Sequence, residues 1–240
     1  MRKILLGLLS ISALLWPQEI SGSKQLLVVS TESWSASTGK LQRYEWIKNV
    51  WIKTGKNIDV KLGRNGLGWG VGLHTTPKNA KFIKKEGDGK APAGIFSLRQ
   101  VFGYQPFVIE YPYEVYTVSD HCVDDVKSKF YNKIVNSKKI KVDYKSFEHM
   151  KLSKNYYKYG IVIDHNHIDG KGAVKGAGSC IFMHIKSIAT SGCTVMRENE
   201  IKEVIKWLDA DSKPLLVQGT EEIVDMLIKE VNRVYIPHKK

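Results

Sequence analysis

Short runs of β-forming residues separated by turn signals make up the first quarter of this chain and recur toward its end. Residues 25–30 form an apolar run, and residues 41–51 alternate loosely with aromatic side chains. Thr-Gly-Lys turn signals stand at residues 38–40 and 54–56. Period-two patterning bounded by such turns is typical of strands. We therefore predict a β meander over residues 24–62.

Glycine-rich turns follow this meander. Five of the ten residues from 63 to 72 are glycines, and residues 86–94 form a second turn-rich segment. The first segment lacks the Gly-Lys-Ser/Thr ending of a phosphate-binding loop, so tight turns and close backbone approach explain it better. Three later apolar runs predict further strands, at residues 159–163, 179–185 and 215–218.

Two helices are predicted near the C-terminal end. The apolar face of the first comprises Ile201, Val204, Ile205 and Leu208, at helical spacing. Thr220 is a candidate N-cap of the second. Its predicted buried stripe comprises Ile223, Met226, Leu227 and Val231. The fold class is therefore mainly β with a few helices (α+β).

The N-terminal residues indicate export. Arg2 and Lys3 precede an apolar run of 13 residues, 4–16. That run is shorter than the roughly 20 residues of a membrane span but suits a signal peptide. We expect a signal peptide over 1–23, a single domain over 24–240 and a periplasmic or extracytoplasmic location. An uncleaved anchor and a buried helix are the alternatives.

The chain carries 37 Lys+Arg against 24 Asp+Glu, a net charge of +13. Ten lysines lie between Lys127 and Lys158, interleaved with aromatic residues. Such a stretch can bind nucleic acid. For an exported protein we favour a basic insertion at about 121–160 with a solvated surface, because charge alone gives only non-specific attraction.

The three cysteines have different surroundings. Cys122 and Cys180 are candidates for a disulfide, with a core position for Cys180 as the alternative. Cys193 follows Ser191 and Gly192 in a predicted turn, and His184 ends an apolar run just before it. A thiol needs a base to become a nucleophile, so Cys193 and His184 form a candidate dyad.

These residues resemble the catalytic motif of the L,D-transpeptidase (YkuD-type) family, in which a histidine precedes a [Ser/Thr]-x-Gly-Cys element. Residues 190–193 match that element, and His184 takes the position of the histidine. Residues 63–70 and 86–96 are similar to the early strands of the family and its Pro-[Thr/Ala]-Gly-x-Phe turn. The resemblance covers essentially the mature chain and implies a β-sandwich or barrel-like catalytic domain.

The resemblance also implies roles for individual residues. Cys193 would attack and His184 would transfer protons, while the N–H groups of Gly192 and Cys193 would stabilise the oxyanion. The other residues that we expect to bind substrate are Ser191, Thr190, Asp164 and Arg197. The chain departs from the family pattern in three ways. Many members have histidine at the position of Ser191, and arginine or asparagine at that of Val195. The connection from His184 to Cys193 is also shorter than usual.

The implied function is acyl transfer from peptidoglycan stem tetrapeptides through a cysteine thioester, in cell wall biogenesis and cell shape. The alternatives are an L,D-carboxypeptidase that trims tetrapeptide to tripeptide, and a non-catalytic module that binds the cell wall. The expected partners are stem peptides. We expect no cofactor and no nucleic acid, and peripheral association with the cell envelope stays open.

Alternating histidines mark one further candidate site. His165 and His167 could chelate a metal ion together with Asp164 and Asp169. Turn-forming residues surround them, so we favour a surface loop without metal.

Overall fold

The structure is a computed structural model that describes residues 22–167 and 172–233. The predicted signal peptide, apart from Gly22 and Ser23, lies outside the described residues. The strands are β1 (Gln25–Thr31), β2 (Thr38–Ile47), β3 (Val50–Lys61), β4 (Leu67–Trp69), β5 (Ala91–Gly103), β6 (Tyr113–Val115), β7 (Asp120–Val123), β8 (Ile134–Asn136), β9 (Phe147–His149), β10 (Tyr159–Ile163), β11 (Phe182–Ile185), β12 (Thr194–Met196) and β13 (Leu215–Thr220). The α-helices are α1 (Glu198–Trp207) and α2 (Glu221–Arg233), and two single-turn 3-10 helices span Asn155–Tyr157 and Ala210–Ser212.

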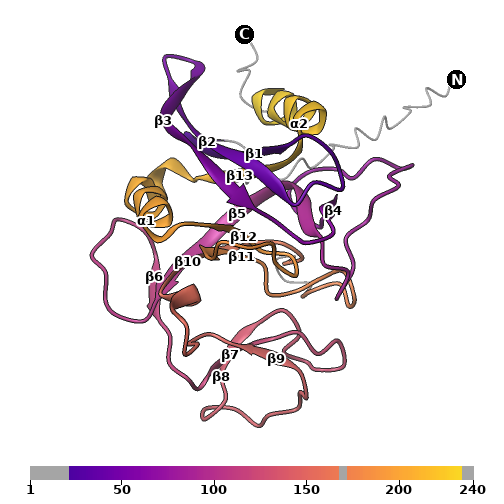
Figure 1. Ribbon diagram of the computed structural model, residues 1–240, viewed down its shortest axis with the longest axis vertical. Helices are drawn as coiled ribbons and strands as arrows, with labels where there is room; N and C mark the ends of the chain where they lie inside the picture. Colours follow the sequence, from indigo (N-terminus) through magenta and orange to yellow (C-terminus); the bar gives the residue numbers. More distant parts are fainter. Residues whose placement is uncertain (1–21, 168–171, 234–240) are drawn as a thin grey trace, which may run out of the picture.

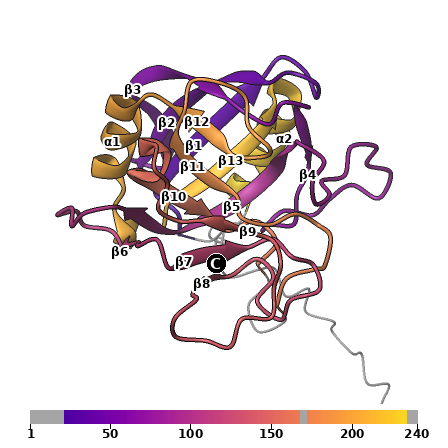
Figure 2. The ribbon, with the colours of Figure 1, turned by 60° about the horizontal axis from the view of Figure 1, so that its bottom comes forward.

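The main sheet of the described chain closes on itself. Its strands follow the order β10-β11-β12-β3-β2-β1-β13-β5, and β5 pairs with β10 again. Eight strands thus form a barrel-like ring (Figures 1 and 2), and β4 and β6 pair with β5 outside it. Closure pairs the backbone groups that an open sheet would leave at its edges. The predicted mainly β, α+β class is confirmed.

The predicted meander is the antiparallel run β1-β2-β3. Lys48 and Asn49, both with positive φ, form the tight turn between β2 and β3. Leu41 on β2, together with Ile58 and Val60 on β3, is buried in the core. Core and solvent positions alternate only at the end of β3, where exposed Asp59 separates Ile58 and Val60, while β1 is buried along almost its whole length.

Both predicted helices are present. The face of α1 that carries Ile201 is buried, and α2 packs on β13 and β1. The Ile223 N–H donates to Thr220 Oγ1 at 3.4 Å, which confirms the N-cap. The predicted stripe on α2 is wrong at Met226, which is 42% exposed, because the barrel contacts the neighbouring row that contains Val224. In the described residues no helix is both long enough and apolar enough to cross a bilayer.

The basic segment 121–160 forms a side module beneath the barrel (Figure 1). Its sheet has the order β8-β7-β9. Tyr131, Tyr144 and Tyr157 are buried in or under this module, while most of its lysines face solvent. The expected solvated surface with inward-facing rings describes the segment well. A disulfide between Cys122 and Cys180 fastens β7 to the chain just before β11, with the two Cα atoms 5.9 Å apart.

The turn at Gly66 predicts a measurable loss of stability. Gly66 has φ +77°, and a Cβ there would clash with the carbonyl oxygen of Trp34. Gly66→Ala should therefore lower the free energy of unfolding by about 3 kcal/mol. Gly87 is the matched control: its φ is +71°, but a Cβ would have no atom within 4 Å. Gly87→Ala should cost only about 1 kcal/mol. Equal shifts of both denaturant midpoints would contradict the packing argument.

Candidate active site

A cavity of about 570 Å³ lies between the barrel and the side module. Strand β11 and the 190–193 turn form its barrel wall, and β9 with the 3-10 helix Asn155–Tyr157 forms the opposite wall. Its lining comprises Lys84, Glu86, Gly87, Asp124, Phe147, Glu148, His149, Leu152, Tyr156, Tyr157, Ser179, Cys180, Ile181, His184, Lys186, Thr190, Ser191, Gly192 and Cys193. The candidate dyad, Cys193 and His184, is among these residues.

Thr190 builds the turn that presents Cys193. Its hydroxyl donates to the Cys193 carbonyl oxygen at 2.6 Å and accepts from the Gly192 N–H at 3.1 Å. Its backbone N–H donates to the Leu62 carbonyl oxygen, which ties the turn to the barrel. A hydroxyl that closes a turn in this way fixes the backbone that carries Cys193. Thr190 therefore supports Cys193 through the backbone.

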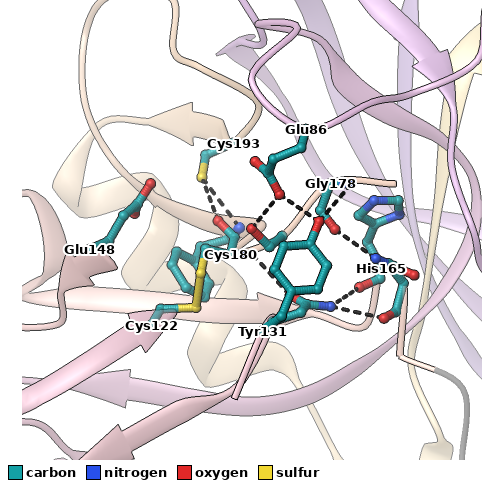
Figure 3. The surroundings of a disulfide bond; sticks show 12 residues. Glu86, Cys122, Tyr131, Glu148, His165, Gly178, Cys180 and Cys193 are labelled. Atoms are coloured by element: carbon teal, nitrogen blue, oxygen red, sulfur yellow. Dashed lines mark hydrogen bonds between the residues drawn. A yellow bond between two sulfur atoms is a disulfide. The ribbon is translucent and has the colours of Figure 1, made fainter. Parts of the chain in front are cut away.

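Cys193 is buried and lines the cavity, and Figure 3 shows its sulfur beside Cys180. Its sulfur accepts from the Phe182 N–H at 3.4 Å and donates to the Cys180 carbonyl oxygen at 3.6 Å. Burial, followed by the negative charge of Glu148, raises the pKa of Cys193 to about 12. In the unliganded protein this side chain is therefore a neutral thiol at physiological pH.

His184 lies on the same sheet face as Cys193. Strand β11 runs parallel to β12 with Met183 opposite Thr194, so Cys193 lies beside Phe182, two residues from His184. Side chains two residues apart on a strand share a face. His184 Nδ1 lies 3.2 Å from the Ile185 carbonyl oxygen. Burial lowers the pKa of His184 to about 4, so the imidazole is neutral.

The two candidate catalytic groups share the cavity without contacting each other through a hydrogen bond. Within the described residues no hydrogen bond joins the Cys193 thiol to the His184 imidazole. Each is held by backbone groups instead. Proton transfer between them therefore requires one of these backbone bonds to be exchanged when substrate enters.

The role of Gly192 as an oxyanion donor stays a prediction. Its N–H already donates to Thr190 Oγ1 in the unliganded turn. Ser191 lines the cavity, and its hydroxyl accepts from Arg64 Nη1 at 2.9 Å. Arg64 therefore brings a positive charge to the edge of the turn, a contact that the sequence did not indicate.

Asp164 and Arg197 are not among the residues that line this cavity, and their roles in substrate binding stay predictions. Asp164 forms an ion pair with Arg99 and accepts from the Ser97 hydroxyl at 3.0 Å. Arg197 forms an ion pair with Glu200 at the start of α1, where the Glu200 carboxylate also accepts from the Arg197 N–H. Asp164 thus links the end of β10 to β5, and Arg197 stabilises the first turn of α1.

The strand predicted over 179–185 begins only at Phe182. Cys180 has φ +55°, which no regular strand residue adopts, so the chain bends at the disulfide. This bend directs the Cys180 carbonyl oxygen at the Cys193 thiol. Glu86, which also lines the cavity, secures the same segment, since its carboxylate accepts from Ser179 and from Tyr131, each at 2.6 Å.

Sequence reasoning missed the charged lining of the cavity. Lys84, Lys186, Glu148 and Tyr157 come from four separate segments, and no spacing rule joins them. Glu148 stood out in the sequence only as one of the few carboxylates in the lysine-rich segment. Its position opposite the 190–193 turn depends on how the side module folds back.

His165 holds two loops together. Its Nδ1 accepts from the Val71 N–H at 3.3 Å, and its Nε2 lies 3.0 Å from the Ala177 carbonyl oxygen. Among the described residues no group of three or more His, Cys, Asp or Glu side chains could hold a metal ion. Asp169, a member of the candidate cluster, lies outside the described residues. The described environment of His165 is thus that of a buried structural histidine.

Two buried histidines predict acid instability. Burial lowers the pKa of His165 to about 3 and that of His74 to about 4, below the value near 6.5 in the unfolded chain. The folded state therefore binds fewer protons than the unfolded state. Stability is complete above pH 6.5 and falls by several kcal/mol as the pH drops from 6.5 toward 4. Unfolding free energies measured across this range should show the loss, and His165→Gln should make it smaller without abolishing it, because His74 and His184 keep their lowered pKa values. A flat profile in the unmodified protein would contradict the assignment.

Comparisons with known proteins were made for the whole chain. No protein-family model and no curated protein sequence matches it. Two solved structures are similar. One is Bd1075 of Bdellovibrio bacteriovorus, at 13% identity and a TM-score of 0.40 over 88% of this chain and 55% of that one. The other is the helical cell shape determining protein Pgp2 of Campylobacter jejuni, at 12% identity and a TM-score of 0.38 over 88% of this chain and 57% of that one.

This chain thus matches little more than half the length of either structure. At these identities and TM-scores the two alignments define neither the family nor the activity of the chain.

Proposed function

We propose that this protein is an exported cysteine acyltransferase of the L,D-transpeptidase (YkuD-type) class that acts on peptidoglycan stem tetrapeptides. One observation carries the proposal: the free thiol of Cys193 and the imidazole of His184 line one cavity, while the other two cysteines are joined in a disulfide. The ordered motifs at residues 63–70, 86–96 and 190–193 support it. A disulfide suits an extracytoplasmic location, because reducing compartments keep thiols reduced.

In the proposed first half-reaction, His184 accepts the Cys193 proton as substrate displaces a backbone hydrogen bond. The thiolate then attacks the carbonyl carbon of the third residue of the stem peptide, which is joined by an amide bond to the terminal D-alanine. The C–N bond breaks, and His184 returns the proton to the departing amine, which leaves a thioester on Cys193. The Cys193 N–H is the proposed oxyanion donor. The Gly192 N–H could join it only after releasing Thr190 Oγ1.

The second half-reaction determines the product. An amine acceptor gives a new cross-link, whereas water gives a tripeptide. In either case the acceptor loses a proton to His184 and the thiol is restored. The cavity holds both groups of the dyad and has room for a peptide as well as an acceptor, at about 570 Å³.

The test is incubation of the purified protein with tetrapeptide monomers, followed by mass spectrometry of the muropeptides. New 3–3 cross-links with released D-alanine would support a transpeptidase, and tripeptides with D-alanine a carboxypeptidase. Unchanged muropeptides, with the protein nevertheless sedimenting with isolated cell walls, would overturn both enzymatic readings in favour of a wall-binding module.

A further inference from the structure

Glu148 reaches into the cavity from the side module. It lies on β9, and the hydroxyl of Tyr157 donates to its Oε2 at 2.5 Å. The Tyr157 ring meets the His184 ring edge-on, with centroids 4.8 Å apart. Glu148, Tyr157 and His184 therefore form a continuous wall. Figure 3 shows the Glu148 carboxylate and the Cys193 sulfur on the same side of the disulfide.

The cavity lining carries three carboxylates, Glu86, Asp124 and Glu148, and two lysines, Lys84 and Lys186. Asp124 and Glu86 are the carboxylates that act on Glu148, and Lys186 is the cation that acts on it. Burial is the largest cause that raises the pKa of Glu148. The charges of Asp124 and Glu86 raise this pKa further, whereas the hydrogen bond from the Tyr157 hydroxyl lowers it. Three carboxylates thus share one cavity in a chain whose net charge is +13.

Asp124 provides an independent sign of a missing partner. Its Oδ1 is buried and accepts no hydrogen bond from the described residues. A buried carboxylate oxygen without a donor is costly, and such groups in native proteins usually await a ligand, ion or water. Because Asp124 lines the same cavity as Glu148, a donor bound in the cavity could serve both.

Glu148 also acts on the nucleophile. Its negative charge opposes ionisation of Cys193, whereas Lys186 and Lys84 favour ionisation more weakly. A positive group placed beside Glu148 would remove that opposition. Binding of such a group and activation of the thiol are therefore coupled through Coulomb interactions in a poorly solvated site.

We propose that Glu148 is a specificity-determining residue. Together with Asp124 it binds a positively charged group of the substrate beside Cys193. This bound group offsets the negative charge of Glu148, and the Cys193 thiol becomes reactive. The inference rests on the proposed function for its biological meaning. The substrate class it defines is a peptide that carries an ammonium group near the scissile carbonyl.

The test compares two methanethiosulfonate reagents, one with a trimethylammonium ethyl group and one with a sulfonate ethyl group. The Cys193 thiolate attacks the sulfenyl sulfur of either reagent, forms a mixed disulfide and expels methanesulfinate, so no further oxidant is needed. Rates of labelling are followed by intact-protein mass spectrometry at pH 8 in low salt. We expect the cationic reagent to react faster in the unmodified protein.

Glu148→Gln should lower the cationic-to-anionic rate ratio by about tenfold or more, given Coulomb energies at an effective dielectric constant of about 20. Glu148→Asp keeps the charge and should keep the preference, which a purely structural role would not predict. Glu110→Gln removes an exposed carboxylate elsewhere and is the matched control. Thermal melts establish that each variant is folded.

An unchanged ratio in folded Glu148→Gln would overturn the inference, as would a Cys193 that neither reagent labels in the native protein. The outcome is separable from the proposed function, because labelling needs no turnover. A preserved charge preference without conversion of muropeptides would refute the function alone. Conversion of muropeptides without a charge preference would refute only the role of Glu148.

Discussion

Cys193→Ser should lower the rate of muropeptide conversion by a factor on the order of 10⁴ or more. The substitution keeps a small polar side chain in the same turn, so the hydrogen bonds that Thr190 makes with the backbone should survive. What it removes is the sulfur that would form the thioester. Losing the nucleophile of a covalent mechanism typically costs rate factors of this order, because the remaining groups cannot replace it.

Two controls make this prediction sharp. Ile188→Ala alters the same connection between β11 and the 190–193 turn at a side chain that is 62% exposed, and it should leave conversion within about twofold of the unmodified protein. Cys193→Ser should also match the unmodified protein in thermal stability to within a few degrees. If Cys193→Ser still converted muropeptides at the rate of the unmodified protein, Cys193 would not be the nucleophile.

Removing the disulfide should have the largest effect on stability. Cys122 and Cys180 are separated by 58 residues in the sequence, and their bond closes a loop that contains most of the side module. By chain entropy alone, a loop of this length stabilises the folded state by about 4 kcal/mol. For a domain of about 200 residues, this corresponds to a fall in Tm of about 8–16 °C. Differential scanning calorimetry of the double variant Cys122→Ser, Cys180→Ser measures it.

The same double variant should lose most of its activity at temperatures where it is still folded. The disulfide holds the bend at Cys180, whose carbonyl oxygen contacts the Cys193 thiol, and it anchors the module that carries Glu148. Gly172→Ala is a control for mutation at a turn without neighbours, since a Cβ there meets nothing within 4 Å. A double variant with unchanged Tm and unchanged conversion would show that the barrel and module dock without the bond.

Several strands and both helices were predictable because their signals are local, whereas the barrel itself was not. Alternation over residues 24–62 defined the first three strands, and the spacing of Ile201 to Leu208 defined α1. The Thr220 cap was equally local. The closure of the barrel through β5 and β10 depends on pairing between distant segments, which no sequence window contains.

The departures from the sequence pattern have specific physical causes. Met226 satisfies the helical period, but the barrel contacts the adjacent row of α2. Asp164 pairs with Arg99, which is distant in the sequence, whereas Arg197 pairs with Glu200 one helical turn away. The Gly192 N–H was expected to face the substrate, and the Thr190 hydroxyl two residues away accepts it instead.

The sequence pointed to the two central residues of the candidate site but not to their surroundings. The motif identified Cys193 and His184, and both do line one cavity. The sequence could not show that burial would leave both groups neutral, nor that a carboxylate from β9 would face them. Such effects depend on solvent exclusion by segments that are remote in the chain.

Intact-protein mass spectrometry of the protein mixed with tetrapeptide and quenched in acid tests the central claim most directly. The account predicts a covalent adduct whose mass equals that of the tetrapeptide minus D-alanine. Peptide mapping should locate it on Cys193, and hydroxylamine should release it, as expected for a thioester. Release of D-alanine with no adduct on Cys193, or the same adduct in Cys193→Ser, would contradict it.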